Sequence, residues 1–413
     1  MRAEQDCLAR AEAAPAANPP ALRIALLGYR SHPHVGGQGI YLKYLSRALL
    51  QLGHQVDVLS GPPYPELDPG VRLVKIPSLD LYAAPNHIRA LRWHHLRSFS
   101  DVFEWWSMAT GGFAEPYTFG RRVVRYLREH RDEYDVVHDN QSLCYGLLEL
   151  QQLGLPVVAT VHHPITRDRD LAVQEASDWG HRLLIRRWYS FLKMQKKVVR
   201  QLNHVVTVSE CSRRDIAAEF GRNESRTQVI GNGVDTDLFR PQPEISRVPG
   251  RIITTTSSDQ PLKGFGVLLE ALQQVRTLRP DAHLVVIGKL QPDGRNQRLL
   301  KQLGLEDCVS FRSGISDLEL VQEYARASVA VCPSLYEGFG LPAAEAMSCG
   351  VPLVSSDGGA LPEVVGDAGI LVSAGDAKAL AEGLTKVLGN RVLSQDLMQM
   401  GRQRIVREFC WNR

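Results

Sequence analysis

The amino-acid sequence predicts an α/β protein built from two doubly wound domains, each with a parallel sheet. Apolar runs of strand length alternate with segments of helical spacing along most of the chain, a pattern typical of parallel strands joined by crossover helices. The alternation occurs twice, and residues 241–250 between the two series contain three prolines and a glycine. Such a segment predicts a linker, so we expect a two-lobed chain with a cleft between the lobes.

The first domain is predicted to span residues 22–240. The run Leu22–Leu27 indicates a buried strand, and Gly39–Leu52 has the spacing of a helix. Six further strands are expected at residues 55–59, 71–76, 135–138, 156–161, 204–208 and 227–230. The preceding residues 1–21 are rich in alanine, proline and charge and lack an apolar stretch of signal-peptide length. We expect them to form a disordered tail.

The second domain is predicted to span residues 251–413. Helices are expected at Gly266–Arg276 and Asp317–Arg326, because apolar residues recur there at helical intervals. Apolar runs predict five strands in this domain, at residues 252–255, 282–287, 308–311, 329–332 and 352–355.

Composition limits the classes of protein to which this chain can belong. The 413 residues are 44% hydrophobic and 23% charged, which is ordinary for a soluble globular protein of two or three domains. The net charge of +3 gives no general case for nucleic-acid binding. The seven cysteines form no Cys-x-x-Cys pair, which favours a reducing compartment and argues against zinc. We therefore expect a cytoplasmic protein, with a peripheral position on the inner face of the membrane as the alternative.

The most informative segment is Pro333–Glu345, which places two carboxylates near the start of a predicted helix. Gly338 and Gly340 open a turn after the strand, and Pro342 suits the first turn of a helix. The free N–H groups of a helix N-terminus bind phosphate. Glu345 can accept hydrogen bonds from ribose hydroxyls, and Glu337 from a sugar ring. Together these groups indicate a nucleotide-sugar site, whereas the alternative is a loop with two solvated glutamates.

This segment resembles the motif of retaining glycosyltransferases of family 4, which have the GT-B fold of two Rossmann-like domains around a cleft. The resemblance continues through Gly358–Val372 and covers the chain from about Arg23 to Trp411. It implies transfer of a sugar from a nucleotide-diphospho-sugar to an acceptor hydroxyl with retention of configuration, without a metal or another cofactor. The acceptors considered are a lipid, a polysaccharide or a small-molecule glycoside.

The resemblance also assigns roles to individual residues. It implies that the catalytic residues are His162, Lys263 and Glu337. His162 ends a predicted strand, where a side chain points into the crevice, and Lys263 can neutralise a leaving diphosphate. The implied donor-binding residues are Gly36, Gly37, Lys263, Glu337, Gly338, Phe339, Gly340, Leu341 and Glu345. Taken alone, the histidine could equally be a polar loop residue, and the lysine is better interpreted as an ordinary solvated loop residue.

The sequence departs from the family pattern at two places. The family has an arginine a few residues before Lys263, but no arginine follows Arg251 in this stretch, where Ser257 and Ser258 stand instead. Another basic residue or these serines would have to serve the phosphates. The family also has a last helix that crosses back to the first domain. The sequence stops where this helix would begin, so we expect either that the helix is missing or that the sequence is a truncated product.

A basic stripe in the first domain suggests a docking surface. No acidic residue occurs between Asp178 and Glu210. Six basic side chains fall on one side of a predicted helix there: Arg182, Arg186, Lys193, Lys196, Lys197 and Arg200. The segment Ile88–Phe113 adds further basic and aromatic residues. These features predict docking on an anionic membrane or a charged acceptor, whereas the alternative is a solvated helix face.

Two alternatives to a glycosyltransferase remain at this point. One is another enzyme with the same fold, such as a phosphorylase or a nucleotide-sugar epimerase. The other is a catalytically weak protein that only binds a nucleotide-sugar, which the missing arginine favours. The motif Asp168-Arg-Asp170 is similar to a divalent-metal site of a different fold, but it lies in a charged loop, and we interpret it as solvated.

Overall fold

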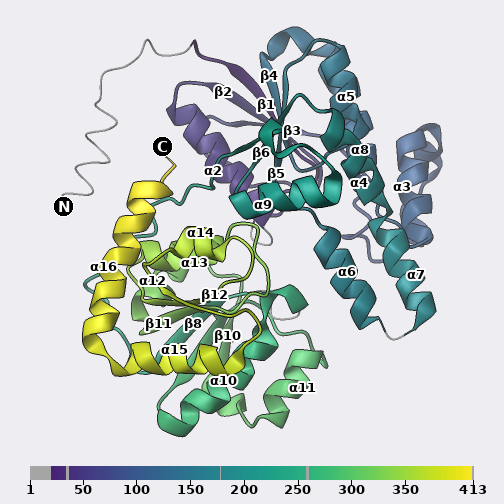
Figure 1. Cartoon of the computed structure of the whole chain (residues 1–413). Helices are drawn as coiled ribbons and strands as arrows, with labels where there is room; N and C mark the ends of the chain where they lie inside the picture. Colours follow the sequence, from purple (N-terminus) through teal and green to yellow (C-terminus); the bar gives the residue numbers. More distant parts are fainter. Residues whose placement is uncertain (1–19, 34–36, 177, 257–259, 412–413) are drawn as a thin grey trace. The chain divides into compact units, whose positions relative to one another are not determined.

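The computed structural model describes residues 20–33, 37–176, 178–256 and 260–411. The chain divides into two compact units (Figure 1). The first unit comprises the described residues up to Val208 together with Ser212–Ile230, and the second comprises Ser209–Cys211 and the residues from Gly231 onward. Each unit is an α/β fold with one fully parallel sheet, as the sequence predicts.

The first unit is built on a seven-stranded parallel sheet with the order β3-β2-β1-β4-β5-β6-β7. The strand order reverses between β1 and β4, and open α/β sheets bind ligands at the carboxyl ends of strands beside such a switch point. The strands are β1 (Arg23–Gly28), β2 (Gln55–Ser60), β3 (Arg72–Lys75), β4 (Val136–Asn140), β5 (Val157–Val161), β6 (His204–Thr207) and β7 (Thr227–Val229).

Helices cover both faces of this sheet, which explains why its strands are continuous apolar runs. Ala25 and Leu27 belong to the core beneath α4, α5 and α8, whereas Leu26 packs with Leu42 of α2 on the opposite face (Figure 1). The helices on the sheet are α2 (Gly37–Gln51), α4 (Glu115–Glu129), α5 (Tyr145–Gln152), α8 (Leu192–Gln201) and α9 (Glu210–Asp215), which continues as the π-helix η5 (Ile216–Phe220).

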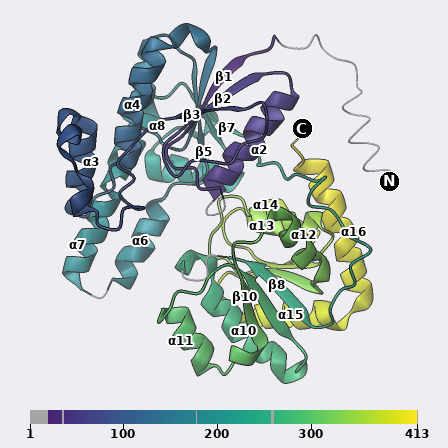
Figure 2. The ribbon, with the colours of Figure 1, turned by 180° about the vertical axis from the view of Figure 1, so that it is seen from behind.

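Three further helices lie together at one side of the first unit, as Figure 2 shows. They are α3 (Phe99–Ala109), α6 (Thr166–Glu175) and α7 (Trp179–Trp188). Short 3-10 turns accompany them, at η1 (Ile88–Ala90), η2 (Trp93–Arg97), η3 (Arg131–Glu133), η4 (Tyr189–Phe191) and η6 (Glu224–Arg226). Arg187 Nη2 donates a hydrogen bond to Thr110 Oγ1 over 3.1 Å, which connects α7 to the end of α3.

The prediction of a single basic helix is wrong, because the structure has two helices in this segment. The turn η4 separates α7 from α8. Helix α8 buries Leu192, Val198 and Val199 in the core, whereas α7 buries no residue, and Leu184 is 52% exposed rather than turned inward. Packing on the core therefore fixes the direction of α8 alone, and tertiary contacts override the continuous helical spacing.

The second unit is built on a six-stranded parallel sheet with the order β10-β9-β8-β11-β12-β13. Its strands are β8 (Arg251–Thr255), β9 (His283–Ile287), β10 (Val309–Arg312), β11 (Val329–Cys332), β12 (Leu353–Ser356) and β13 (Ile370–Val372). The last of these was not among the predicted strands, because three residues are too few for a clear apolar run. The order reverses between β8 and β11, which defines the switch point of this sheet.

The helices of the second unit enclose a separate core. Leu268 and Leu272 of α10 pack with Leu380 and Leu384 of α15 against the sheet. The helices and 3-10 turns are η7 (Pro261–Lys263), α10 (Phe265–Leu278), α11 (Arg295–Gln302), η8 (Glu306–Cys308), α12 (Asp317–Arg326), α13 (Leu341–Ser348), α14 (Leu361–Val365), α15 (Ala377–Gly389) and α16 (Arg391–Glu408). None of the described helices in either unit is long and apolar enough to cross a membrane.

Candidate functional site

Lys263 and Glu337 form an ion pair beside the switch point of the second sheet. Lys263 Nζ donates a hydrogen bond to Glu337 Oε1 over 2.8 Å, and Ser334 Oγ donates to the same oxygen over 2.7 Å. Backbone bonds fix Glu337 as well, because its N–H donates to Gly358 O and its carbonyl accepts from the Ala360 N–H. The structure thus brings together two residues that the sequence assigns to the site, and it adds Ser334.

Gly264 explains why these two side chains meet. Its φ of +63° lies in the left-handed region, and a Cβ at this position would lie 2.0 Å from Pro333 O. Only glycine fits there, because it lacks a Cβ. The close approach lets Leu335 N–H donate to Leu262 O over 2.7 Å. The turn η7, which ends at Lys263, is therefore held directly against the loop that carries Glu337.

Helix α13 presents its N-terminus to the end of the same loop. Gly340 precedes the helix with a φ of +103°, and Pro342 lies in the first turn, as expected from its missing N–H. The first backbone N–H groups of a helix have no intrahelical partner, and they suit an anion. Phe339 is buried and packs edge-on against Phe409 with a centroid distance of 5.6 Å, so only its backbone can serve a ligand.

Glu345 lies one turn into α13, in an environment that disfavours its charge. Burial raises the pKa of its carboxyl group to about 8, and the negative charge of Asp317 adds to this effect, whereas a hydrogen bond with Tyr324 opposes it. Tyr324 is itself buried, and its hydroxyl contacts Thr255 Oγ1 over 3.0 Å. A carboxyl group in such a setting can both donate and accept hydrogen bonds with a pair of hydroxyls.

In the first unit, His162 directly follows β5 and is held from several sides. Its Nε2 lies 2.7 Å from Asn140 Oδ1, its backbone N–H donates to Gln141 Oε1 over 2.5 Å, and the Tyr41 ring contacts it edge-on. Because an amide oxygen only accepts, Nε2 carries the hydrogen and Nδ1 is left as an acceptor. Burial lowers the pKa of His162 to about 3, helped by His163 and His138. The imidazole is therefore neutral near pH 7.

The residues that orient His162 were missed from the sequence. Asn140 is the last residue of β4, the neighbour of β1 at the switch point, and Gln141 follows it. Asn140 Nδ2 also donates to Gln38 O over 3.1 Å, which connects the start of α2 to the same strand end. The polar run Asp139–Ser142, which begins in the last two residues of β4 and continues beyond it, is the signal that could have identified them.

The remaining residues predicted to bind the donor are the glycines near the start of α2, and the structure describes only some of them. Gly36 lies outside the described residues, as do Ser257 and Ser258. Gly37 begins α2, and a Cβ built on it would meet no atom within 4 Å. Gly39 has the opposite environment, because a Cβ there would lie 2.2 Å from His32 O. Gly39 is therefore required by packing, whereas the space beside Gly37 is open in the described part of the chain.

The basic residues of the predicted stripe are exposed, but two have structural contacts. Lys197 lies over the Tyr145 ring at 5.6 Å, and Arg200 Nε donates to Phe220 O over 2.5 Å. Among the described residues, no three histidine, cysteine or acidic side chains are grouped as a metal site would need. Asp168 instead lies 3.6 Å from His163 Nε2, and Asp170 pairs with Arg169.

Comparison with known proteins places this arrangement in a family. A model of "Glycosyltransferase Family 4" matches residues 35–238, and one of "Glycosyl transferases group 1" matches residues 240–404. The chain is 48% identical to the MMP α-(1→4)-mannosyltransferase of Mycolicibacterium hassiacum, over 94% of this chain and 95% of that protein. The chain belongs to glycosyltransferase family 4.

Other relatives of this glycosyltransferase are more distant. A glycogen synthase of Mycobacterium tuberculosis is 28% identical over 94% of this chain and 92% of its own length. Among solved structures, a sucrose-phosphate synthase from Thermosynechococcus elongatus has a TM-score of 0.70 at 24% identity, covering 94% of this chain and 95% of that one. Anabaena HepE in complex with UDP-glucose has a TM-score of 0.68 at 17% identity, covering 94% of this chain and 96% of that one. These structural matches confirm the GT-B fold.

Proposed function

We propose that this glycosyltransferase moves mannose from a nucleotide-diphospho-mannose to a hydroxyl of a glycoside acceptor and forms an α-(1→4) linkage. The near full-length identity of 48% to an α-(1→4)-mannosyltransferase supports this choice of sugar and linkage. An α product made from an α-linked donor requires retention of configuration, so we also propose a retaining reaction. A nucleotide-sugar donor is supported by the solved relative that binds UDP-glucose.

The observation that carries the proposal is the Lys263–Glu337 pair at the loop leading into α13. We assign the ammonium group of Lys263 and the N-terminus of α13 to the diphosphate, because both stabilise negative charge. The carboxylate of Glu337 accepts hydrogen bonds from the transferred sugar, and Glu345 binds the ribose hydroxyls. Ser334 keeps Glu337 oriented through its 2.7 Å hydrogen bond.

In the proposed reaction, the bond from the anomeric carbon to the diphosphate oxygen breaks, and a bond to the acceptor oxygen forms on the same face. The acceptor proton passes to the departing diphosphate. Lys263 stabilises the charge that develops on this leaving group, which is the largest source of rate enhancement in such a reaction. The neutral imidazole of His162 is suited to contact sugar hydroxyls rather than to transfer a proton, because its pKa is lowered to about 3.

A donor screen followed by product analysis tests the proposal. Thermal shift would be measured with guanosine, uridine and adenosine diphosphates and with their mannose derivatives. We expect one diphospho-mannose to stabilise the protein, and Glu345→Ala to abolish the shift. Transfer to an α-mannoside would then be followed, and NMR of the product should show a new α-(1→4) linkage. Absence of any shift together with absence of transfer would overturn the proposal.

The same measurements separate the alternative functions. A phosphorylase would need inorganic phosphate for turnover, and an epimerase would convert the nucleotide-sugar without an acceptor. A protein that only binds the donor would show the thermal shift but neither transfer nor slow hydrolysis of the nucleotide-sugar. Each of these results would contradict the mannosyltransferase proposal in a different way.

A peripheral position on an anionic membrane remains a proposal as well. Four basic side chains, Lys193, Lys196, Lys197 and Arg200, are exposed along α8. Helix α7 next to it exposes Trp179 and Leu183. Basic residues beside exposed aromatic and aliphatic ones favour binding to the surface of an anionic bilayer.

A further inference from the structure

A second set of polar and aromatic side chains lies at the carboxyl edge of the first sheet, where no role has yet been assigned. Arg30 follows β1 by two residues, on the loop that leads to α2. Tyr82 comes from the segment between β3 and α3, and Glu115 is the first residue of α4. Carboxyl ends of parallel strands are where open α/β folds bind their ligands, so the geometry of this group matters.

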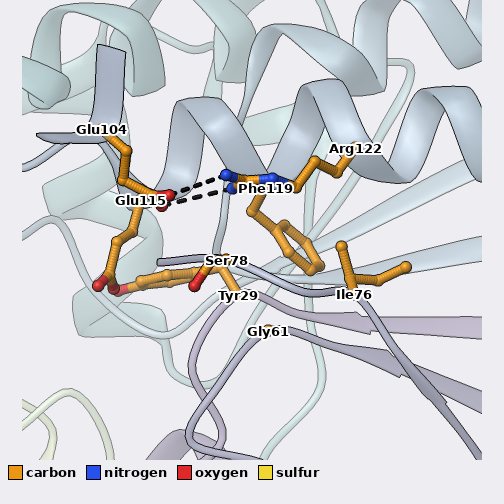
Figure 3. A pocket seen from close by; sticks show the side chains of 8 residues that line it. All are labelled: Tyr29, Gly61, Ile76, Ser78, Glu104, Glu115, Phe119 and Arg122. Atoms are coloured by element: carbon orange, nitrogen blue, oxygen red, sulfur yellow. Dashed lines mark hydrogen bonds and ion pairs between the residues drawn. The ribbon is translucent and has the colours of Figure 1, made fainter. Parts of the chain in front are cut away.

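Arg30 connects the other two residues. Its Nη1 donates to both carboxylate oxygens of Glu115, each over 3.0 Å. Its guanidinium carbon lies 4.6 Å from the centre of the Tyr82 ring. Figure 3 shows the carboxylate of Glu115 beside the ring of Tyr29. The three side chains therefore combine a fixed cation, a fixed carboxylate and an aromatic ring.

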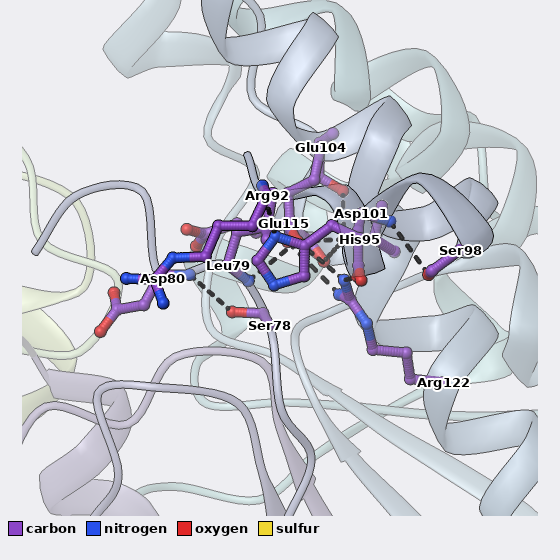
Figure 4. A network of polar contacts seen from close by, with 12 residues as sticks. Ser78, Leu79, Asp80, Arg92, His95, Ser98, Asp101, Glu104, Glu115 and Arg122 are labelled. Atoms are coloured by element: carbon purple, nitrogen blue, oxygen red, sulfur yellow. Dashed lines mark hydrogen bonds and ion pairs between the residues drawn. The ribbon is translucent and has the colours of Figure 1, made fainter. Parts of the chain in front are cut away.

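Arg30 and Tyr82 are partly exposed to solvent, whereas Glu115 is buried beneath them, as is most of the neighbouring ion pair of Arg122. The Arg30 side chain is 29% exposed and the Tyr82 residue 37%. Within the described part of the chain, the Nε and Nη2 atoms of Arg30 have no hydrogen-bond partner. Arg122 differs, because its Nη2 donates to Asp101 Oδ1 over 2.6 Å and to Glu104 Oε2 over 2.8 Å while its side chain is only 13% exposed (Figure 4).

Glu104, the partner of Arg122, helps to hold Tyr82 in position. Glu104 accepts from the backbone N–H of Leu79 over 3.3 Å, which anchors the segment that leads to Tyr82 (Figure 4). The Tyr82 ring is then supported by edge contacts with Phe113 and Trp188, at centroid distances of 6.0 Å and 5.8 Å. The ring and the guanidinium group are therefore preorganised, which reduces the cost of binding a ligand between them.

The chemistry of the group suits the ring of a neutral sugar. A pyranose has an apolar C–H face that packs on an aromatic ring, and neighbouring hydroxyls that bond to a donor and an acceptor at once. Arg30 offers open donors, and Glu115 offers lone pairs. We propose that Arg30, Tyr82 and Glu115 form the subsite that binds the terminal sugar of an uncharged acceptor.

The charges around this acceptor subsite argue against a phosphorylated acceptor. Arg30 is paired with Glu115, and the pKa of Glu115 is raised to about 7 by burial and by the nearby carboxylates of Glu104 and Asp80, although Arg30 lowers it. Arg122 is paired with Asp101 and Glu104. Both Arg30 and Arg122 are therefore paired with carboxylates, and a neutral glycoside is preferred to a phosphorylated one.

The inference rests on the proposed function and names the group that recognises its acceptor. The test uses the full chain with its diphospho-mannose donor and compares methyl α-mannoside with methyl α-mannoside 6-phosphate. We expect wild type to prefer the neutral acceptor. Arg30→Lys and Tyr82→Leu should each raise the acceptor KM about tenfold, the effect of losing one good contact. Donor KM and acceptor-independent donor hydrolysis should stay within about twofold.

Two control variants and one variant with an expected gain of function make the result specific. Arg125→Ala on the exposed side of α4 and Leu52→Ala at the exposed position after α2 should leave the acceptor KM unchanged. At pH 8, above the pKa of about 7 to which burial raises the Glu115 carboxyl group, Glu115→Gln removes a negative charge, so it should raise kcat/KM for the phosphorylated acceptor relative to the neutral one. If Arg30→Lys and Tyr82→Leu lower the Tm while the acceptor KM stays at the wild-type value, the pair is only structural and the inference is wrong.

The failure of this inference can be told from the failure of the proposed function. If wild type transfers mannose but the variants keep the wild-type acceptor KM, only the acceptor subsite is refuted. If wild type transfers mannose to neither acceptor and shows no donor hydrolysis, the mannosyltransferase proposal fails and the acceptor subsite fails with it.

Discussion

Lys263 Nζ lies 2.8 Å from Glu337 Oε1, so the cation assigned to the diphosphate is held by the carboxylate assigned to the sugar. The pair is partly open, with Lys263 27% and Glu337 12% exposed. Each partner keeps the other in place before the donor binds, which is the preorganisation that charge stabilisation needs. It also makes the two residues depend on one another, because the loss of one leaves the other without its main ionic partner.

We therefore predict that Lys263→Ala lowers kcat by about 100-fold, as expected for removing a group that stabilises charge on the leaving diphosphate. Initial rates of transfer at saturating donor would measure the effect. Lys301→Ala, an exposed lysine on α11, is the matched control and should keep the wild-type kcat. An unchanged kcat in Lys263→Ala would show that the lysine does not serve the leaving group.

Gly264→Ala is predicted to destabilise the second unit and to reduce activity. The new Cβ would lie 2.0 Å from Pro333 O at a φ of +63°, so the turn η7 must move away from the loop that carries Glu337. Gly304→Ala is a close control, because Gly304 has a φ of +66° but no atom within 4 Å of the added Cβ. It should cost about 1 kcal/mol from the backbone conformation alone.

Chemical denaturation would give the free energy of unfolding of both alanine variants. We expect Gly264→Ala to lose clearly more stability than Gly304→Ala, because only the former adds a clash with backbone. Equal losses in the two variants would mean that the contact with Pro333 is unimportant, and that Lys263 is positioned in some other way.

Glu345 should make stability fall as the pH rises between about 4.5 and 8. The folded state keeps this proton up to the raised pKa of about 8, whereas the unfolded state releases it near the ordinary value of 4.5. In that window the folded state binds more protons, so raising the pH favours unfolding, by at most about 1.4 kcal/mol per pH unit. Glu345→Gln should flatten the dependence.

Denaturation midpoints measured from pH 5 to pH 8 would test this effect. Glu382→Gln, at an exposed position on α15, provides the control and should retain the wild-type slope. If Glu345→Gln and wild type show the same slope, the carboxyl group of Glu345 is ionised in the folded protein throughout this range.

His162 is predicted to remain neutral from pH 5 to pH 8. Its lowered pKa of about 3 results mainly from burial, and the Asn140 amide oxygen holds the hydrogen on Nε2. NMR spectra of the histidine ring should show no titration of His162 in this range, whereas Asn140→Ala should alter its ring signals by removing the hydrogen bond. A His162 signal that titrates near pH 6.5 would contradict the assignment.

The exposed lysines of α8 predict weak, salt-sensitive binding to anionic vesicles. Basic side chains near an anionic surface contribute about 1 kcal/mol each, so Lys193→Ala with Lys196→Ala should reduce the bound fraction severalfold. Sedimentation with phosphatidylglycerol vesicles, and with phosphatidylcholine vesicles as the uncharged control, would measure it. Equal sedimentation with both lipids would argue against an electrostatic membrane surface.

The local sequence was sufficient for features that depend on neighbouring residues in the chain. The apolar runs of β1 and β11, the glycine and proline around the start of α13, and the spacing of Glu337 and Glu345 all follow from short-range rules. The family resemblance that this segment carries is confirmed by the relatives. The prediction of one continuous basic helix was wrong at residues 189–191. Helical spacing alone does not show that only the second part of this segment, α8, packs on the core.

By itself, the sequence determined the α/β class, the two parallel sheets and the family, since these follow from periodicity and from one contiguous motif. The tertiary structure decided which distant residues meet: Ser334 and Lys263 at Glu337, Asn140 at His162, and Glu115 at Arg30, which is 85 positions away. Parallel strands bring their carboxyl ends to one edge through long crossovers. Contacts at that edge are therefore set by strand order, which local spacing does not encode.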